Sequence, residues 1–337
     1  MWFQRDTALG AVIYLLACAA VLIASPRSSL AQRRGGAFAP APPLKGAEDK
    51  PIAIDTELVS LRVSVTDKRG RSAVGLDQSS FAVYEDGVRQ EIGFFSDQDA
   101  PAAVGVVFDV SASMTGEKIR RARDAVARFI QTSHEEDEYF LIGFNQFPRL
   151  LLDGVGGSEA MAARISGIEP QGATALYDAV AFGLKHVKRS RLQKRALIVI
   201  SDGEDNRSRL GFGDVKRTLR ESDVTVYTVL IGPLMPRSNA GMLMDELASA
   251  SGGKSYFPSD AEKMSEAFEQ IALELRRQYS IGYVPSNFVT NGKWRRIEIK
   301  VTPPPGFPRL VARSRKGYYA PGRVRKGYGS GTALSPP

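Results

Sequence analysis

Residues 106–114 read VVFDVSASM, an apolar run that ends in the pattern Asp-x-Ser-x-Ser. A helical pattern begins a few residues later, at Lys118. The run predicts a buried strand that delivers Asp109, Ser111 and Ser113 to one loop at the carboxyl end of a sheet. One carboxylate and two hydroxyls on a rigid support suit a hard divalent cation such as Mg²⁺. The stretch therefore predicts metal-dependent binding.

The residues around this stretch alternate between apolar strand-like runs and helical runs. We expect strands at 104–108, 139–144, 147–152, 196–200, 224–231 and 254–257, and helices at 118–133, 160–168, 174–190, 215–221, 242–250 and 261–278. This βαβ alternation is typical of a mostly parallel sheet covered by helices on both faces. The predicted fold class is therefore α/β, doubly wound and Rossmann-like, over residues 101–278.

The segments before and after this α/β part are β-rich. Residues 52–98 contain alternating apolar runs and a hairpin signal with Asp86-Gly87 at the tight turn. Residues 279–320 contain strand-like runs at 279–284, 295–301 and 310–313. Neither flank is long enough for a large core of its own. We expect the two flanks to pair into one small β-sandwich-like domain, with the α/β domain inserted between them.

The N-terminus has the organisation of an export signal. A basic start precedes a long apolar run, and Ser29 and Ala31 are small residues at the positions that a signal peptidase reads. Residues 1–31 are predicted to be a signal peptide, residues 32–51 a flexible linker, and residues 321–337 a disordered tail. Because the apolar run approaches spanning length, retention as a membrane anchor is the alternative.

Composition narrows the classes of function. The formal net charge is +8, but the basic clusters are spread along the chain with acids between them, so we expect no nucleic-acid partner. The only cysteine, Cys18, lies in the export signal, so the mature chain has no thiol for a disulfide, a metal site or a nucleophile. Of the two histidines, His134 follows a helix and His186 lies on a helix among lysines, where we expect it to be exposed. Neither is a convincing catalytic base.

Two later segments can complete the metal site. Residues 172–176, GATAL, open a helix at which the Thr174 hydroxyl can face the same crevice. Residues 198–203, IVISDG, form a second buried strand, and a neighbouring strand end would bring Asp202 beside Asp109. Two carboxylates balance the charge of a divalent ion, and the hydroxyls add ligands without adding negative charge.

Each of these residues also has a purely structural alternative. Ser113 and Thr174 could be helix N-caps, and Asp202 could cap a turn. The combination, in order and with each piece at a strand end or a helix start, favours the metal site. Glu204 and Asp205 follow directly, and we expect them to form a solvated acidic turn.

On these residues the chain resembles the von Willebrand factor type A (vWA) family over about residues 101–278, with its metal-ion-dependent adhesion site (MIDAS) motif intact. The resemblance implies that Ser111, Ser113 and Thr174 contact the metal. It implies that Asp109 and Asp202 do so directly or through water. The metal is usually Mg²⁺, with Ca²⁺ or Mn²⁺ as substitutes, and a carboxylate from a partner commonly completes the coordination shell.

The flanking motifs extend the resemblance. The sequences VSVTD at 63–67, FAVYEDG at 81–87, YSIGY at 279–283 and RKGY at 315–318 occur in this order around the domain. This order is similar to that of exported bacterial proteins of the "VWFA-related, acidobacterial-type" group. The molecular role of that group is poorly defined, so the resemblance implies a fold and a site but no particular partner.

We therefore expect an exported, divalent-metal-dependent module for adhesion or assembly that captures an acidic residue of a protein partner. It would be periplasmic, in the cell envelope or secreted, and membrane-bound only if the N-terminal segment is retained. One alternative is a metal-dependent α/β hydrolase or phosphatase. However, the sequence lacks an Asp-x-Asp pair after the first strand, a P-loop and a G-x-S-x-G elbow. We therefore predict that the chain is not an enzyme. The other alternative is a structural envelope component with a stabilising metal.

Overall fold

The computed structural model describes residues 58–322, with gaps at 132–133, 135, 155–157, 204 and 233–237. The predicted signal peptide with Cys18, the linker at 32–51 and nearly all of the tail at 321–337 lie outside these residues. Within the described part, none of the helices is long and apolar enough to cross a bilayer. The α/β part and the β part belong to the same unit, Asp55–Pro337.

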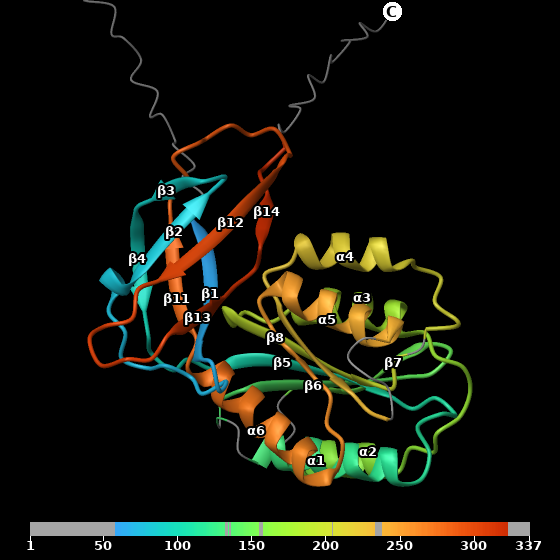
Figure 1. Cartoon of the computed structure of the whole chain (residues 1–337). Helices are drawn as coiled ribbons and strands as arrows, with labels where there is room; N and C mark the ends of the chain where they lie inside the picture. The colour runs from blue at the N-terminus through green and yellow to red at the C-terminus, as the bar shows by residue number, and fades with distance from the viewer. Residues whose placement is uncertain are drawn as a thin grey trace, which may run out of the picture. The chain divides into compact units, whose positions relative to one another are not determined.

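A six-stranded sheet in the order β10-β9-β8-β5-β6-β7 forms the centre of the α/β part (Figure 1). Its strands are β5 (Ala102–Asp109), β6 (Glu138–Phe144), β7 (Pro148–Asp153), β8 (Lys194–Ser201), β9 (Thr225–Leu230) and β10 (Ser255–Tyr256). All neighbours are parallel except β7, which runs antiparallel to β6. Every residue of β5 and β9 is buried, because helices cover both faces of these central strands.

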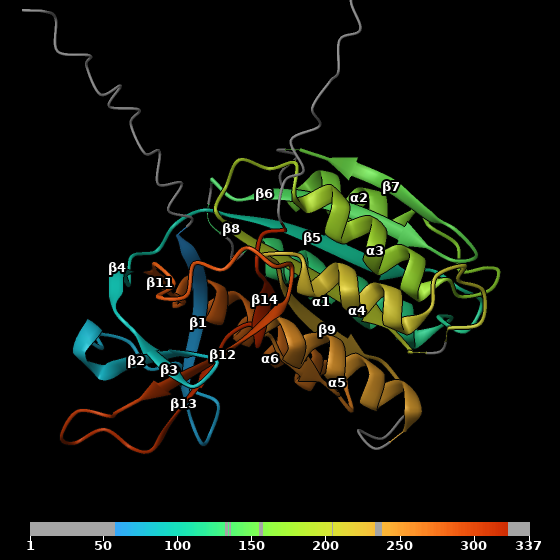
Figure 2. The same ribbon diagram turned by 90° about the horizontal axis from the view of Figure 1, so that it is seen from above.

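Six helices cover the described sheet, three on each face (Figures 1 and 2). One face is covered by α1 (Glu117–Gln131), α2 (Ser158–Ser166) and α6 (Ala261–Arg276). The other is covered by α3 (Leu176–Val187), α4 (Phe212–Arg220) and α5 (Asn239–Ser251), which lie side by side (Figure 2). In α1, for example, Ile119, Ala122, Val126 and Phe129 form the buried stripe expected of an amphipathic helix. The predicted α/β fold class is confirmed.

Two four-stranded antiparallel sheets make up the β part. The first has the order β13-β1-β11-β4, from β1 (Val59–Asp67), β4 (Ile92–Ser96), β11 (Tyr279–Tyr283) and β13 (Leu310–Arg313). The second has the order β14-β12-β2-β3, from β2 (Phe81–Glu85), β3 (Val88–Gln90), β12 (Trp294–Val301) and β14 (Gly317–Tyr319). The short helix η1 (Gln78–Ser80) directly precedes β2. Each sheet combines strands from both flanks of the sequence, as β1 pairs with β11 and β2 with β12. The short strand β14 was not predicted.

The Asp86-Gly87 hairpin signal is confirmed between β2 and β3. Both loop residues have positive φ, +48° for Asp86 and +86° for Gly87. A two-residue loop of this kind matches the right-handed twist of the flanking strands, and Asp and Gly tolerate the left-handed region better than other residues.

Buried polar contacts join the β part to the α/β part. Arg313 of β13 forms an ion pair of 2.5 Å with Glu274 of α6, and the Tyr227 hydroxyl donates to the same carboxylate at 3.1 Å. The amide of Gln278 donates to the Ser64 hydroxyl and to the Tyr227 hydroxyl, each at 3.3 Å. The two parts therefore share a buried polar network, which the sequence patterns did not reveal.

Candidate metal centre

The predicted ligands lie at the carboxyl edge of the central sheet, where the strand order reverses. After β5 the chain moves to β6 on one side, and the later strands β8 and β9 lie on the other side. Phe108 is opposite Ile200 in the β5–β8 register, so Asp109 lies beside Ser201, and Asp202 follows directly. Open α/β sheets bind ligands at this kind of switch point.

Asp109 is fully buried and held by two hydrogen bonds. Its Oδ1 accepts from the Ser111 backbone N–H at 2.8 Å, and its Oδ2 accepts from the Ser201 hydroxyl at 2.6 Å. Burial raises the pKa of Asp109 to about 6; the hydrogen bonds from Ser201 and Ser111 oppose this shift, and the charge of Asp202 adds to it. The site therefore holds negative charge that lacks adequate compensation.

The two serines extend from the interior to the surface. Ser111 is buried, Ser113 is exposed, and their hydroxyl oxygens are 3.0 Å apart. A pair of neighbouring hydroxyls beside a carboxylate provides several oxygen ligands within one short loop. Because Ser113 is exposed, the site opens to solvent at this end.

Thr174 is buried, and its segment is fastened to both site loops through the backbone. The carbonyl of Gly172 accepts from the Ala112 N–H at 3.0 Å, which ties the segment to the loop after β5. The N–H of Thr174 donates to the Asn206 side chain at 2.9 Å, and its carbonyl accepts from the N–H groups of Asn206 and Arg207 at 3.0 and 3.1 Å. These bonds place Thr174 between the Ser111 loop and the loop that follows Asp202.

The capping alternative is wrong for Thr174. The N-cap position of α3 is Ala175, which provides no side-chain hydrogen bond. Instead, the Asp205 carboxylate accepts from the Tyr177 N–H at 2.9 Å and from the Ser208 hydroxyl at 2.6 Å. The expected solvated turn is therefore wrong for Asp205, because this half-buried carboxylate satisfies the Tyr177 amide at the start of α3. Glu204 lies outside the described residues.

Asp202 is buried and only partly compensated. Its Oδ2 lies 3.3 Å from the Lys118 ammonium, which also donates to the Ser113 carbonyl at 3.2 Å. Its Oδ1 is buried without a hydrogen-bond partner. Burying a carboxylate oxygen without a hydrogen-bond partner costs free energy of folding. In this protein the oxygen belongs to a cluster of hydroxyls and a second carboxylate. This donor set fits a hard divalent cation.

Hydroxyl ligands are essential to that fit. Among the described residues, no group of three or more His, Cys, Asp or Glu side chains is placed to hold a metal ion. The two carboxylates of Asp109 and Asp202 would thus need the oxygens of Ser111, Ser113 and Thr174 to complete a shell.

Sequence reasoning missed four residues of this region, namely Lys118, Ser201, Asp205 and Asn206. Ser201 could have been noticed, because it precedes Asp202 at the end of a buried strand beside Asp109. The roles of Lys118, Asp205 and Asn206 depend on which loops meet in space, and no local pattern indicates this.

Both histidines are remote from the site. His134 follows the end of α1, and His186 lies in the last turn of α3; these helices run back from the carboxyl edge, so both residues lie toward the amino edge. The expected exposure of His186 is wrong: it is buried, and its Nε2 lies 2.8 Å from an Asp153 carboxylate oxygen. It packs beside the rings of Phe140 and Phe182, which its place among lysines in the sequence concealed.

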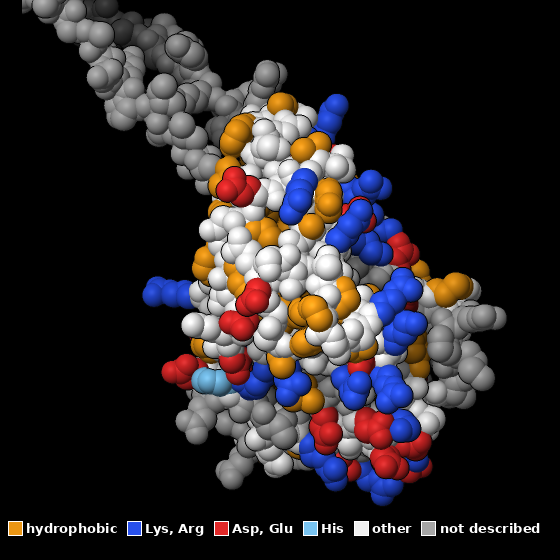
Figure 3. All heavy atoms as spheres, turned by 60° about the vertical axis from the view of Figure 1, so that its left-hand side comes forward, with side chains coloured by type: hydrophobic (Ala, Val, Ile, Leu, Met, Phe, Trp, Pro, Cys, Tyr) orange, Lys and Arg blue, Asp and Glu red, His pale blue; other side chains and the backbone are white. Residues whose placement is uncertain are grey.

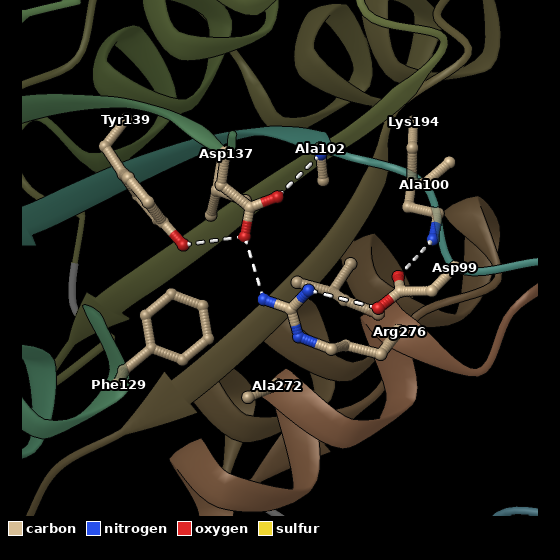
Figure 4. A pocket seen from close by; sticks show the side chains of 11 residues that line it. Asp99, Ala100, Ala102, Phe129, Asp137, Tyr139, Lys194, Ala272 and Arg276 are labelled. Atoms are coloured by element: carbon tan, nitrogen blue, oxygen red, sulfur yellow. Dashed lines mark hydrogen bonds and ion pairs between the residues drawn. The ribbon is translucent and has the colours of Figure 1, made fainter. Parts of the chain in front are cut away.

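A second charged cluster occupies the amino edge of the sheet (Figure 4). Asp99 lies 3.5 Å from Lys194 and 3.2 Å from Arg276, and Arg276 also lies 3.1 Å from Asp137. Asp137 accepts in addition from the N–H of Ala102 at 2.8 Å. The cavity between these side chains measures about 10 Å³, the space of one water molecule. The cluster therefore fastens α6 to the sheet and leaves no room for a ligand.

The molecular surface carries both signs of charge. On the face shown in Figure 3, Asp and Glu side chains stand among the Lys and Arg side chains, and hydrophobic side chains are scattered between them. Figure 3 thus agrees with the dispersed basic clusters in the sequence.

Comparison with known proteins finds curated relatives that match just over half of this chain. The chain is 25% identical over 195 residues to an uncharacterized protein of Synechocystis sp., covering 55% of this chain and 44% of that protein. It is 23% identical over 206 residues to inter-alpha-trypsin inhibitor heavy chain H4 of Sus scrofa, covering 56% of this chain and 22% of that protein. The chain thus spans less than half the length of these curated relatives.

A solved structure of low sequence identity and one family model are also similar to this chain. A von Willebrand factor type A protein from Catenulispora acidiphila is 14% identical with a TM-score of 0.46, covering 79% of this chain and 75% of that one. The family model for the von Willebrand factor type A domain matches residues 104–204, a region that includes all five predicted ligands. Over residues 104–204, the chain therefore matches the von Willebrand factor type A domain.

Proposed function

We propose that the carboxyl edge of the sheet is a MIDAS-type site for Mg²⁺, with Ca²⁺ or Mn²⁺ as substitutes. Asp109, Ser111, Ser113, Thr174 and Asp202 would hold the ion. The observation that carries this proposal is the buried Oδ1 of Asp202, which has no hydrogen-bond partner beside a second buried carboxylate. Two buried carboxylates in one site, with the Lys118 ammonium as their single close cation among the described residues, remain unfavourable, and a divalent ion would remove that cost.

We further propose that the protein is a binding module that captures an acidic side chain of a protein partner. When bound, the metal supplies an electrophilic centre for a partner carboxylate. The exposed Ser113 and the buried Asp109 and Ser111 support this role, since they give a site that is buried at one end and exposed to solvent at the other. Charge attraction at such a partly buried site gives specificity through one contact, and the surrounding loops would choose the partner.

The position of the histidines favours binding over hydrolysis. A hydrolase needs a base within hydrogen-bond reach of the reacting water. His186 is buried near the opposite edge against Asp153, and His134 follows the end of α1. Both lie far along the sheet from Asp109. We therefore propose binding at this site, and no hydrolysis with a histidine as the base.

The proposed setting is outside the cytoplasm. The export pattern in residues 1–31 and the resemblance of the flanking motifs to those of the exported acidobacterial-type group support it. There the domain would act in adhesion or assembly at the envelope or in a secreted form.

A crosslinked pull-down from envelope extract tests this proposal. The tagged full chain and its Asp109→Ala variant are compared in Mg²⁺ and in EDTA, with Asp124→Ala as a control at an exposed residue of α1. We expect a set of partners that wild type and Asp124→Ala retain only in Mg²⁺ and that Asp109→Ala loses. Partner recovery that is the same in Mg²⁺ and EDTA would refute metal-dependent capture.

A further inference from the structure

Lys118 places a positive charge inside the candidate metal centre. Its ammonium donates to the Ser113 carbonyl at 3.2 Å and lies 3.3 Å from Oδ2 of Asp202. A Cβ atom at Gly232 would lie 3.7 Å from the same nitrogen. These three neighbours belong to the loops after β5, β8 and β9, so the ammonium lies where three loops of the carboxyl edge meet.

The position of Lys118 within its own helix is unfavourable. It lies in the first turn of α1, directly after Glu117. The positive end of the helix dipole lies at this turn, where acidic side chains are favoured and lysine is not. The local sequence preference therefore does not explain this lysine, whereas its contact with Asp202 does.

The ammonium compensates only part of the negative charge. It contacts Oδ2 of Asp202, and Oδ1 of the same carboxylate has no partner. Asp109 lies close enough for its pKa to be raised by the charge of Asp202, and its own hydrogen bonds come from neutral groups of Ser111 and Ser201. A single positive charge therefore compensates a site that contains two carboxylates.

We infer that Lys118 is a tethered counterion that holds Asp202 while the site is free of metal and competes with the divalent cation for that carboxylate. This inference rests on the proposed metal site. A bound divalent ion and the ammonium would share one carboxylate, and their mutual repulsion in a partly buried setting exceeds the contribution of one lysine–carboxylate hydrogen bond. Lys118 therefore weakens metal binding and stabilises the metal-free protein.

The competing role for Lys118 is positioning. In that case the ammonium would hold Oδ2 so that Oδ1 faces the metal, and removing it would weaken metal binding. The two roles predict opposite signs for the change in metal affinity, so a single titration separates them.

The experiment is isothermal titration of Mg²⁺ into the metal-free full chain. It uses wild type, Lys118→Met, the charge-retaining Lys118→Arg, and Lys185→Met as a control. Lys185 is an exposed lysine in the last turn of α3, at the other end of that helix from the site. Because the Lys118 side chain is 33% exposed and water screens part of its charge, we expect Lys118→Met to bind Mg²⁺ roughly tenfold tighter than wild type, or about 1.4 kcal/mol. Lys118→Arg and Lys185→Met should bind as wild type does.

A second experiment measures the stability of the metal-free protein. In EDTA, Lys118→Met should have a lower urea midpoint than wild type and Lys185→Met, because Asp202 loses its counterion. In saturating Mg²⁺ this difference should disappear or reverse, as the linkage between binding and stability requires.

The outcomes separate the inference from the proposed function. Equal or weaker Mg²⁺ binding by Lys118→Met than by wild type would overturn the counterion role and leave the metal site intact. An absence of binding in wild type and in all variants would overturn the metal site, and the inference with it. Binding by Lys118→Met alone would support the counterion role in its strongest form.

Discussion

Replacing Asp109 by Asn should stabilise the metal-free protein at neutral pH. Burial raises the pKa of Asp109 from its ordinary value of 3.8 to about 6. An acid whose pKa is higher in the folded state favours folding only while it is protonated. The stability that it contributes is therefore fully present below pH 3.8 and is lost as the pH rises through about 6.

The magnitude follows from the size of this shift. About two pKa units correspond to about 3 kcal/mol between the protonated and ionised forms. An asparagine keeps the size of the side chain and has no charge to bury, so Asp109→Asn should recover up to about 3 kcal/mol at pH 7. The asparagine can still accept from the Ser111 N–H, but its amide would meet the Ser201 hydroxyl that now donates to Asp109. We therefore expect a gain of about 1–3 kcal/mol after this rearrangement.

Urea denaturation in EDTA at pH 7, 5 and 4 measures this effect. The gain for Asp109→Asn over wild type should be largest at pH 7, fall to about half at pH 5 and nearly vanish at pH 4. Asp124→Asn, which removes the same charge from an exposed position of α1, should change the free energy of unfolding by less than about 0.5 kcal/mol. In Mg²⁺ wild type should gain stability and Asp109→Asn should not, because it lacks a carboxylate that we propose as a ligand of the ion.

Two results would refute this reasoning. If Asp109→Asn is less stable than wild type in EDTA at pH 7, the hydrogen bonds to the carboxylate outweigh the cost of burying its charge. A gain that is the same at pH 4 and pH 7 would mean that ionisation of Asp109 is not its source.

Five further substitutions, in three tests by urea denaturation, probe other parts of the structure. Glu274→Gln should lower the free energy of unfolding by about 3 kcal/mol, because it leaves Arg313 without its buried carboxylate partner. The double variant with Arg313→Met should lose less than the sum of the two single variants, and full additivity would contradict the pairing. Gly203→Ala should cost at least about 2 kcal/mol, because φ is +88° and the new methyl group would come within 2.5 Å of a leucine side chain. Gly213→Ala, in α4 with no atom near the added Cβ, should not destabilise, and equal losses at both glycines would argue against this account. Asp260→Ala should lower the urea midpoint at pH 7 by removing the N-cap of α6. Because backbone hydrogen bonding lowers the pKa of Asp260, its contribution is present above pH 3.8 and should fade as the pH drops below that value; a difference that persists in acid would contradict the cap.

Much of the fold could be predicted because its signals are local. The all-buried run of β5 and the helical periodicity of α1 are written in residues close together in sequence. The hairpin at Asp86-Gly87 is equally local, since two loop residues alone determine its turn. A short element has too few residues to show such a local pattern. The three-residue strand β14 was therefore not predicted.

The candidate site was predictable only in part. Asp109 ends a recognisable strand, Ser111 and Ser113 follow it in one loop, and Asp202 directly follows a second such strand, so parallel strands alone predicted that they lie at one edge. The exposure of His186 was mispredicted, because its neighbours in sequence are lysines but its neighbours in space are aromatic rings and Asp153.

The sequence alone determined the α/β class, the five candidate ligands and their place beyond the strand ends, because each rests on a short repeat or motif. Only the tertiary structure decided how these ligands are electrostatically balanced. The ammonium of Lys118 reaches Asp202 across 84 positions of sequence, and the Ser201 hydroxyl reaches Asp109 across 92. Hydrogen bonds and charges act through distances of a few ångströms, which are determined by how loops meet in space and not by their order along the chain.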